Sequence, residues 1–473
     1  MSTHAPSARS WIIPALTGAA LGAILGGIFP LSPGAPAPLW LCLPFAALLL
    51  TIAIAPLTIP RIWHAHYPAI ALALGGFVLG HQIAALGGTR GPGAQAVLHA
   101  GIEFYQFLAL VGGLYVASGG VVINVRSRAT PLRSTLLLAI GAILANVLGT
   151  TGASVLLIRP FMRMNRGRLR PFHVLMFIFI VSNCGGCLTP IGDPPLYLGF
   201  LKGVPFLWTL RYMWPMWLLV NGALLVIFWI GDARYPRTPQ PEIEEHASAP
   251  LISGIPGVVC LLLVVAGVFI DPALRLVNPT LAHYPIGATF QCATAAAAYL
   301  LATPSAHRVN HFTLDPVREV GFLFAGIFLT MIPALGYLRA HAHSLDLHSA
   351  TEFYFFTGAL SAVLDNAPTY LSFLQTALGA SDLPMTPQGI QQFITLRGPT
   401  TLEAISLGSV FFGAMTYIGN GPNFMVRSIV DSTHAASPDK SLGTRTPSFG
   451  GYLLYALTIL LPVLILNWLI FIR

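Results

Sequence analysis

The sequence predicts an all-α polytopic membrane protein with about eleven transmembrane helices and two re-entrant hairpins. Of its 473 residues, 55% are hydrophobic and only 8% are charged, whereas a soluble domain carries roughly 25% charged residues. Apolar runs of roughly twenty residues, the length that crosses a bilayer, recur along the chain. The formal net charge of +8 does not indicate nucleic-acid binding, because arginines that flank membrane spans act as topology signals.

Nine of the predicted spans are uninterrupted apolar runs. They are Trp11–Phe29, Leu39–Ile59, Tyr67–Leu86, Ile102–Val125, Trp214–Ile230, Ile252–Ile270, Ile286–Ala302, Val320–Leu338 and Tyr452–Ile472. The first has features of a signal peptide, but it is long for one and more spans follow. We therefore interpret residues 1–38 as a retained N-terminal helix.

Two further spans, 172–201 and 401–430, are predicted to be broken. The first contains Ser182-Asn-Cys-Gly-Gly-Cys-Leu-Thr-Pro-Ile-Gly-Asp-Pro-Pro195, with three glycines and three prolines, which interrupt a helix. Broken backbone at membrane depth is tolerated only where it is buried in protein or lines a wet cavity. We therefore expect half-helices that face a gap near the midplane, as in the binding sites of carriers.

The two hairpins are predicted at 132–158 and 351–378. The first is apolar with a polar centre and has arginines beyond both ends. Since positive flanks stay in the cytoplasm, it should enter and leave on that side. The alternative is an ordinary span with one misplaced arginine cluster. The second hairpin has few fixed positive charges around it and should open to the outside.

The distribution of the 24 Lys and Arg residues favours a cytoplasmic N-terminus and a periplasmic C-terminus. We expect the inner membrane of a bacterial cell. Hairpins that enter from opposite sides imply two inverted repeats, 39–231 and 251–473, joined by a cytoplasmic linker at 232–250.

Short internal matches support the repeat. Thr189-Pro-Ile-Gly-Asp-Pro-Pro195 aligns with Thr416-Tyr-Ile-Gly-Asn-Gly-Pro422, and Val147-Leu-Gly-Thr-Thr-Gly152 aligns more weakly with Val363-Leu-Asp-Asn-Ala-Pro368. Both pairs occur in the same order. Interrupted apolar segments at corresponding places in two halves are the best sequence indication of a transport site.

Asp193 and Asp365 are the acids nearest this predicted site. Burial disfavours a charged carboxylate and a bound cation favours it, so H⁺ and Na⁺ could compete for one group. The candidate binding residues are Thr150, Thr151, Asn183, Thr189, Gly192, Asp193, Asp365, Asn366, Thr369, Thr416, Gly419, Asn420 and Asn423. The simpler alternative is that both acids only cap half-helices. Asn420 and Asn423 could likewise only hold freed backbone groups.

We expect neither an enzyme nor a bound cofactor. The sequence has no Walker glycine loop with its lysine, so ATP-driven transport is not expected. A membrane enzyme is a further alternative, but no nucleophile–base pair supports it. Cys184-Gly-Gly-Cys187 has metal or redox spacing without a second Cys or His pair beside it.

The stretch Gly186–Phe206, together with Leu364–Tyr370 and Gly413–Phe424, resembles the citrate-transport-like branch of the ion transporter superfamily. The resemblance extends over nearly the whole chain. It implies inverted repeats, a homodimer, elevator-type alternating access and a role in carrying Na⁺ and H⁺ or citrate.

The chain departs from the sodium-coupled dicarboxylate carriers of that superfamily, which have a Ser-Asn-Thr triplet at each hairpin tip. Here the tips read Gly149-Thr150-Thr151 and Asp365-Asn366-Ala367. An added carboxylate repels an anion and suits a cation. We therefore predict an Na⁺/H⁺ antiporter with Asp193 and Asp365 as Na⁺ ligands. The alternative is a cation-coupled carrier of citrate or a dicarboxylate.

Overall fold

The computed structural model describes residues 9–28, 38–85, 88, 91–123, 129–235, 252–277, 284–310, 312–436 and 446–473. The first helices are α1 (Arg9–Gly27), α2 (Leu43–Thr58), α3 (Pro60–Ala85), α4 (Pro92–Gly119), α5 (Pro131–Met164), α6 (Pro171–Ile180), α7 (Pro194–Lys202) and α8 (Trp208–Ala233). They are followed by α9 (Ile255–Gly267), α10 (Ile270–Val277), α11 (Ile286–Leu301), α12 (Pro304–Val309), α13 (Asp315–Ala340), α14 (Ala350–Ser361) and α15 (Asn366–Gly379). The last are α16 (Pro387–Arg397), α17 (Thr400–Phe412), α18 (Gly421–Ala436), α19 (Phe449–Tyr455) and α20 (Leu461–Phe471).

Helices dominate the described residues, and eight of them are long and apolar enough to cross a membrane. Four shorter apolar helices accompany them. Large apolar side chains such as Leu16, Ile24 and Leu300 are more than half exposed, which suits a hydrocarbon solvent. The predicted class, an all-α polytopic membrane protein, is confirmed.

Several predicted boundaries were wrong. Helix α3 begins at Pro60 instead of Tyr67, and α4 begins at Pro92 instead of Ile102. Both start at a proline, whose fixed φ suits the first helical turn. The first turns of both helices are polar, so they lie outside the apolar runs from which the boundaries were predicted. Helix α16 was not predicted, and most of the predicted linker, 236–250, lies outside the described residues.

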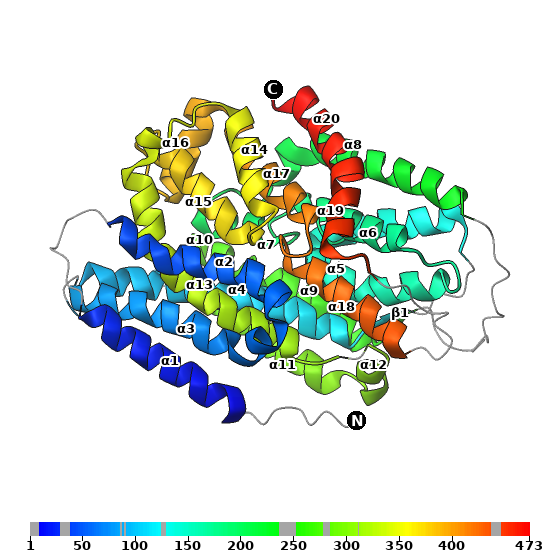
Figure 1. Cartoon of the computed structure of the whole chain (residues 1–473), viewed down its shortest axis with the longest axis horizontal. Coiled ribbons are helices and arrows are strands. Elements are labelled where there is room, and N and C mark those ends of the chain that lie inside the picture. Colours follow the sequence, from blue (N-terminus) through cyan, green and yellow to red (C-terminus); the bar gives the residue numbers. More distant parts are fainter. Residues whose placement is uncertain are drawn as a thin grey trace. The chain divides into compact units, whose positions relative to one another are not determined.

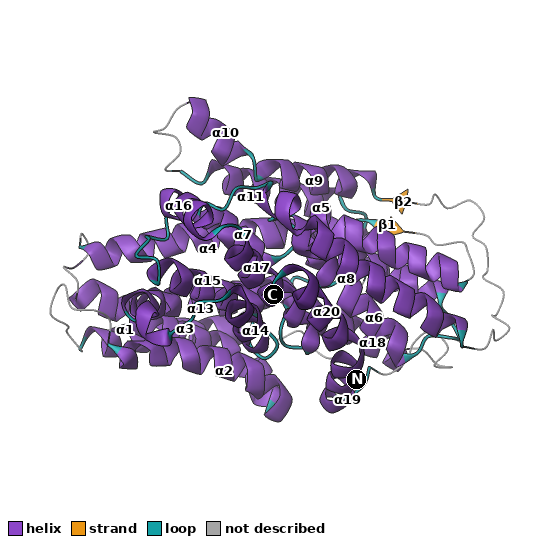
Figure 2. Cartoon of the chain, turned by 90° about the horizontal axis from the view of Figure 1, so that it is seen from above, coloured by secondary structure: helices purple, strands orange, loops and turns teal. Residues whose placement is uncertain are grey.

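Strands β1 (Val122–Ile123) and β2 (Ile252–Ser253) were not predicted either. They form an antiparallel pair in which Val122 lies opposite Ser253, drawn in orange in Figure 2. Two residues per strand are too few for an alternating pattern to reveal them.

The chain divides into two compact units. Unit 1 comprises residues 1–108, 314–347 and 371–385, and unit 2 comprises 109–313, 348–370 and 386–473. In unit 1, α1 and α3 lie side by side (Figure 1). They approach closely because glycines face backbone: a Cβ added at Gly22 would lie 2.1 Å from the carbonyl oxygen of Ala73. Small residues permit such contact between membrane helices.

Unit 2 contains the first predicted hairpin. Helical geometry in α5 is interrupted at Gly149 (φ 72°, ψ 154°). Ser134 Oγ lies 3.3 Å from Asn165 Oδ1, although a straight helix would separate residues so far apart by about 46 Å. The chain therefore doubles back at Gly149.

The remaining interruptions also fall where the sequence predicts them. A short 3-10 helix (Cys184–Leu188) and a loop separate α6 from α7, and a second (Gly413–Met415) with its loop separates α17 from α18. Between α14 and α15 the helical geometry stops at residues 362–365, and Asp365 immediately precedes α15.

Candidate functional site

An equivalent backbone hydrogen bond occurs in both repeats, and each time it joins a hairpin tip to the broken span of the same repeat. The Thr150 N–H, next to the tip of the α5 hairpin, donates to the Gly192 carbonyl oxygen at 2.7 Å. The Asn366 N–H, at the start of α15, donates to the Gly419 carbonyl oxygen at 3.1 Å. The aligned segments therefore have equivalent places in the fold.

Two aligned threonines repeat this equivalence. The Thr189 hydroxyl donates to the Asn146 carbonyl oxygen, and the Thr416 hydroxyl donates to the Ala362 carbonyl oxygen, at 2.5 and 2.6 Å. Each threonine oxygen also accepts the N–H of the glycine three positions later. These predicted site residues thus hold freed backbone groups in this structure.

Asp193 is at the centre of the candidate site, which lies within unit 2, and the residue is 1% exposed. Its Oδ1 accepts hydrogen bonds from the Thr150 hydroxyl at 2.8 Å and the Asn420 amide at 2.9 Å. Its Oδ2 accepts one from the Asn366 amide at 2.6 Å. Although Asp193 precedes α7, its side chain does not cap that helix. The capping alternative therefore fails for Asp193.

Asp365 is in a different situation. Its Oδ1 accepts the Ala367 N–H at 3.0 Å, and its carbonyl oxygen accepts the Thr369 hydroxyl at 2.9 Å. The residue is half-buried. Asp365 therefore caps the start of α15, as the simpler alternative predicts. It is nonetheless close enough to Asp193 for their charges to interact.

Three buried asparagines connect the two interruptions. The Asn183 amide donates to Asn423 Oδ1 at 2.6 Å, and the Asn420 amide lies 3.1 Å from Asn183 Oδ1. The Asn423 amide donates in turn to the carbonyl oxygens of Gly413 and Thr416, at 2.8 and 2.9 Å. Side chains from both repeats therefore build one site within unit 2.

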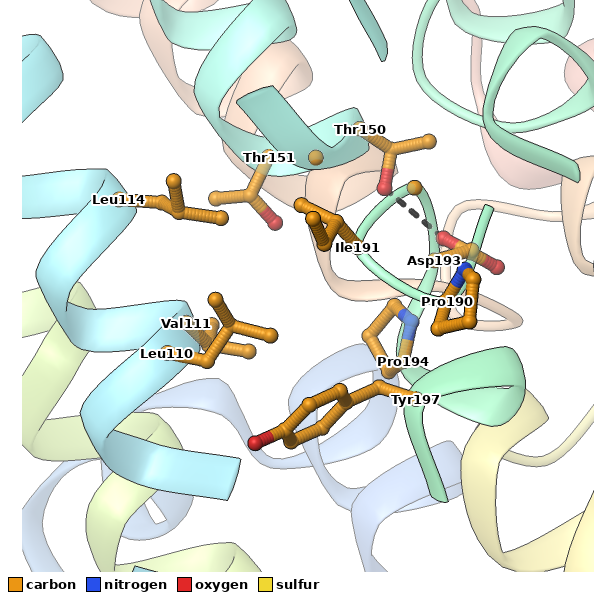
Figure 3. Close-up of a pocket in the computed structure, with 12 residues that line it drawn as sticks. Leu110, Val111, Leu114, Thr150, Thr151, Pro190, Ile191, Asp193, Pro194 and Tyr197 are labelled. Atoms are coloured by element: carbon orange, nitrogen blue, oxygen red, sulfur yellow. Dashed lines mark hydrogen bonds between the residues drawn. The ribbon is translucent and has the colours of Figure 1, made fainter. Parts of the chain in front are cut away.

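A cavity of about 20 Å³ lies beside this network and has room for a water molecule or a bare cation. One side of the cavity is lined by α4, through Leu110, Val111 and Leu114 (Figure 3). The opposite side is lined by Thr150 and Asp193. Thr151 and Gly192 also line it.

The side-chain chemistry around Asp193 suits a hard cation. No Lys, Arg or His of the described chain forms an ion pair or hydrogen bond with this carboxylate. Asn366 Oδ1 is buried and has no hydrogen-bond partner among the described residues. Hydroxyl, amide and carboxylate oxygens are the ligands that such ions prefer.

Two groups of buried polar residues were not among the predicted site residues. Asn146 lies in the first hairpin, and its amide donates to the Gly185 carbonyl oxygen at 2.7 Å. Asp232, fully buried at the end of α8, pairs with Arg168 and with His173. Asn146 stands in the polar centre of its hairpin, which was a usable signal. Nothing local in the sequence brings Asp232 to Arg168.

Comparison with protein families gives a match that extends over nearly the whole chain. Residues 34–472 match the model of a family described as "Putative citrate transport". A comparison with curated proteins finds no match to the chain. The match is consistent with the membrane helices and with the paired helix interruptions. The chain belongs to this citrate-transport family of multi-pass membrane transporters.

Proposed function

We propose that this transporter exchanges Na⁺ for H⁺ and that Asp193 binds the two ions alternately. The observation that carries the proposal is a carboxylate that is 1% exposed and held by three neutral donors. An ionised carboxylate accepts hydrogen bonds only, so this arrangement suits its charged form.

A buried charge without an opposite charge is costly. Binding of Na⁺ or of H⁺ to the carboxylate removes that cost. The same carboxylate cannot bind Na⁺ and carry the proton at the same time. Competition for Asp193 therefore couples the two ions. The unpartnered Oδ1 of Asn366 offers Na⁺ a second side-chain ligand, and Asp365 adds negative charge nearby.

Elevator-type movement is part of the proposal. Every side chain that is hydrogen-bonded to Asp193 belongs to unit 2. The site is therefore able to travel as one body without breaking these bonds. We further infer a homodimer, from the resemblance to the ion transporter superfamily.

The second candidate is cation-coupled transport of citrate or a related carboxylate, which the family match favours. A cavity of about 20 Å³ holds roughly one water molecule and is too small for citrate. This candidate therefore requires a conformation with more room beside Asp193, or an anion site elsewhere.

Everted membrane vesicles with a pH-sensitive dye test the proposal. Addition of Na⁺ should move protons across the wild-type vesicle membrane, and Asp193→Asn should abolish this response. Asp382→Asn is the matched control, because its side chain is 87% exposed and the change removes the same charge. A normal response in Asp193→Asn overturns the role of this carboxylate. Sodium-dependent uptake of labelled citrate without proton exchange favours the second candidate.

A further inference from the structure

Glu403 lies in the first turn of α17, which is one of the shorter apolar helices. The residue is 6% exposed. Its carboxylate forms no ion pair or hydrogen bond with any other described side chain. Acidic residues within membrane segments are rare, and they normally pair with another group or take part in transport. Glu403 therefore requires an explanation.

No neighbouring group compensates a charge on Glu403. The elements packed against α17 include α7, α8, α14 and α16, and none of their described side chains brings a charge close enough to act on this carboxylate. Arg397, in the last turn of α16, is exposed and does not pair with it. Ser406 follows one helical turn later, and its buried hydroxyl makes no hydrogen bond within the described chain. An ionised Glu403 would therefore be unpaired.

Two opposing effects decide whether Glu403 is ionised. The N-terminus of a helix favours a negative charge, but only weakly. Burial of an unpaired carboxylate costs several times as much. The neutral acid, which has taken up a proton from water, is therefore the form that suits this position.

The opposite end of α17 reaches the Asp193 site. A Cβ added at Gly413 would lie 3.5 Å from Asn366 Nδ2 and 3.6 Å from Asn183 Oδ1, and the Asn366 amide donates to Asp193. Ten residues of helix separate Glu403 from Gly413, which corresponds to about 15 Å. Glu403 and Asp193 both belong to unit 2. They are able to travel together, but they are too far apart to share one proton.

We propose that Glu403 is a second proton-binding site of this carrier, and that unit 2 moves only while Glu403 holds its proton. The inference rests on the elevator-type exchange proposed above. An ionised Glu403 would carry an uncompensated charge through the low dielectric of the bilayer, which is costly. Protonation turns the carboxylate into a neutral acid and removes this cost. Loss of the proton at alkaline pH therefore stops the movement.

Exchange of labelled Na⁺ for unlabelled Na⁺ in proteoliposomes isolates this step, because Asp193 then binds Na⁺ in both directions and needs no proton. Wild-type exchange should fall at alkaline pH. Glutamine imitates the neutral acid, so Glu403→Gln should exchange about threefold faster than the wild type, or more, at about pH 9. Glu403→Asp keeps a titratable group and should lose exchange at alkaline pH as the wild type does. Asp382→Asn removes a charge at an 87% exposed side chain and should behave like the wild type.

A gain of rate in Glu403→Gln does not arise from misfolding. Wild-type exchange that stays constant up to about pH 9, or an equal fall in Glu403→Gln, overturns the proposal and leaves the role of Asp193 intact. Sodium exchange that persists in Asp193→Asn overturns the proposed function instead. Absence of Na⁺ exchange from the wild type overturns both.

Infrared difference spectroscopy of the full-length protein in detergent detects the proton directly. At about pH 6 an ordinary glutamate, with a pKa of about 4.3, is ionised. A band of a protonated carboxyl group should nevertheless be present, should be lost in Glu403→Gln, and should persist when Na⁺ is added. Absence of a Glu403-dependent band overturns the proposal. So does a Glu403-dependent band that Na⁺ removes, because Glu403 would then be a cation ligand.

Discussion

Replacement of Gly149 by alanine tests whether the hairpin tip positions Thr150. Gly149 has φ 72° and ψ 154°, a combination that is essentially restricted to glycine. The next residue, Thr150, donates its N–H to the Gly192 carbonyl oxygen and its hydroxyl to Asp193. A change in the backbone at Gly149 should therefore disturb both hydrogen bonds.

The expected cost has two parts. Holding alanine in this conformation costs about 1–3 kcal/mol. The new Cβ would also lie 3.1 Å from the Ile191 carbonyl oxygen and 3.3 Å from Leu114 Cδ1, so both neighbours must yield. Gly149→Asn should not rescue the protein, because asparagine tolerates the left-handed helical region and this ψ lies outside it.

The assay is the apparent unfolding temperature in detergent at one heating rate, since membrane proteins often unfold irreversibly, together with Na⁺-dependent proton movement in vesicles. Gly149→Ala should lower both. Gly152→Ala is the matched control in the same hairpin, where an added Cβ meets only Leu148 Cβ at 3.5 Å. This control should be neutral or slightly stabilising, because alanine favours a helix. If both variants behave alike, the reasoning about the tip is refuted.

Two further predictions concern the buried polar groups. Asn146→Ala should lower the unfolding free energy by about 2–4 kcal/mol. The substitution removes three hydrogen bonds between the Asn146 side chain and backbone groups, one of them to Gly185, and each contributes about 0.5–1.5 kcal/mol. An unchanged unfolding temperature would contradict this prediction. Asp232→Asn should destabilise by about 3–5 kcal/mol, because it leaves the Arg168 charge buried without its partner. The double variant Asp232→Leu, Arg168→Met should lose less stability than Asp232→Asn. A larger loss of stability would show that the unpaired Arg168 charge is not the cause of the destabilisation.

The sequence by itself determined the class of protein, the approximate spans and the places where helices break. These features depend on local properties. Apolar runs identify membrane helices wherever they fold, and the glycines and prolines of 182–195 interrupt a helix whatever surrounds them. Even the aligned segments could be paired in advance, since Thr150 and Asn366 occupy equivalent positions in the structure.

Only the tertiary structure distinguished the two acids. Asp193 and Asp365 looked alike in the sequence, since each precedes a predicted half-helix. Folding brings Asn420, 227 positions away, to the Asp193 carboxylate, whereas Asp365 binds the N–H of Ala367 two residues later. Hydrogen bonds between distant segments depend on packing, which local patterns do not encode, so the centre of the site emerged only from the fold.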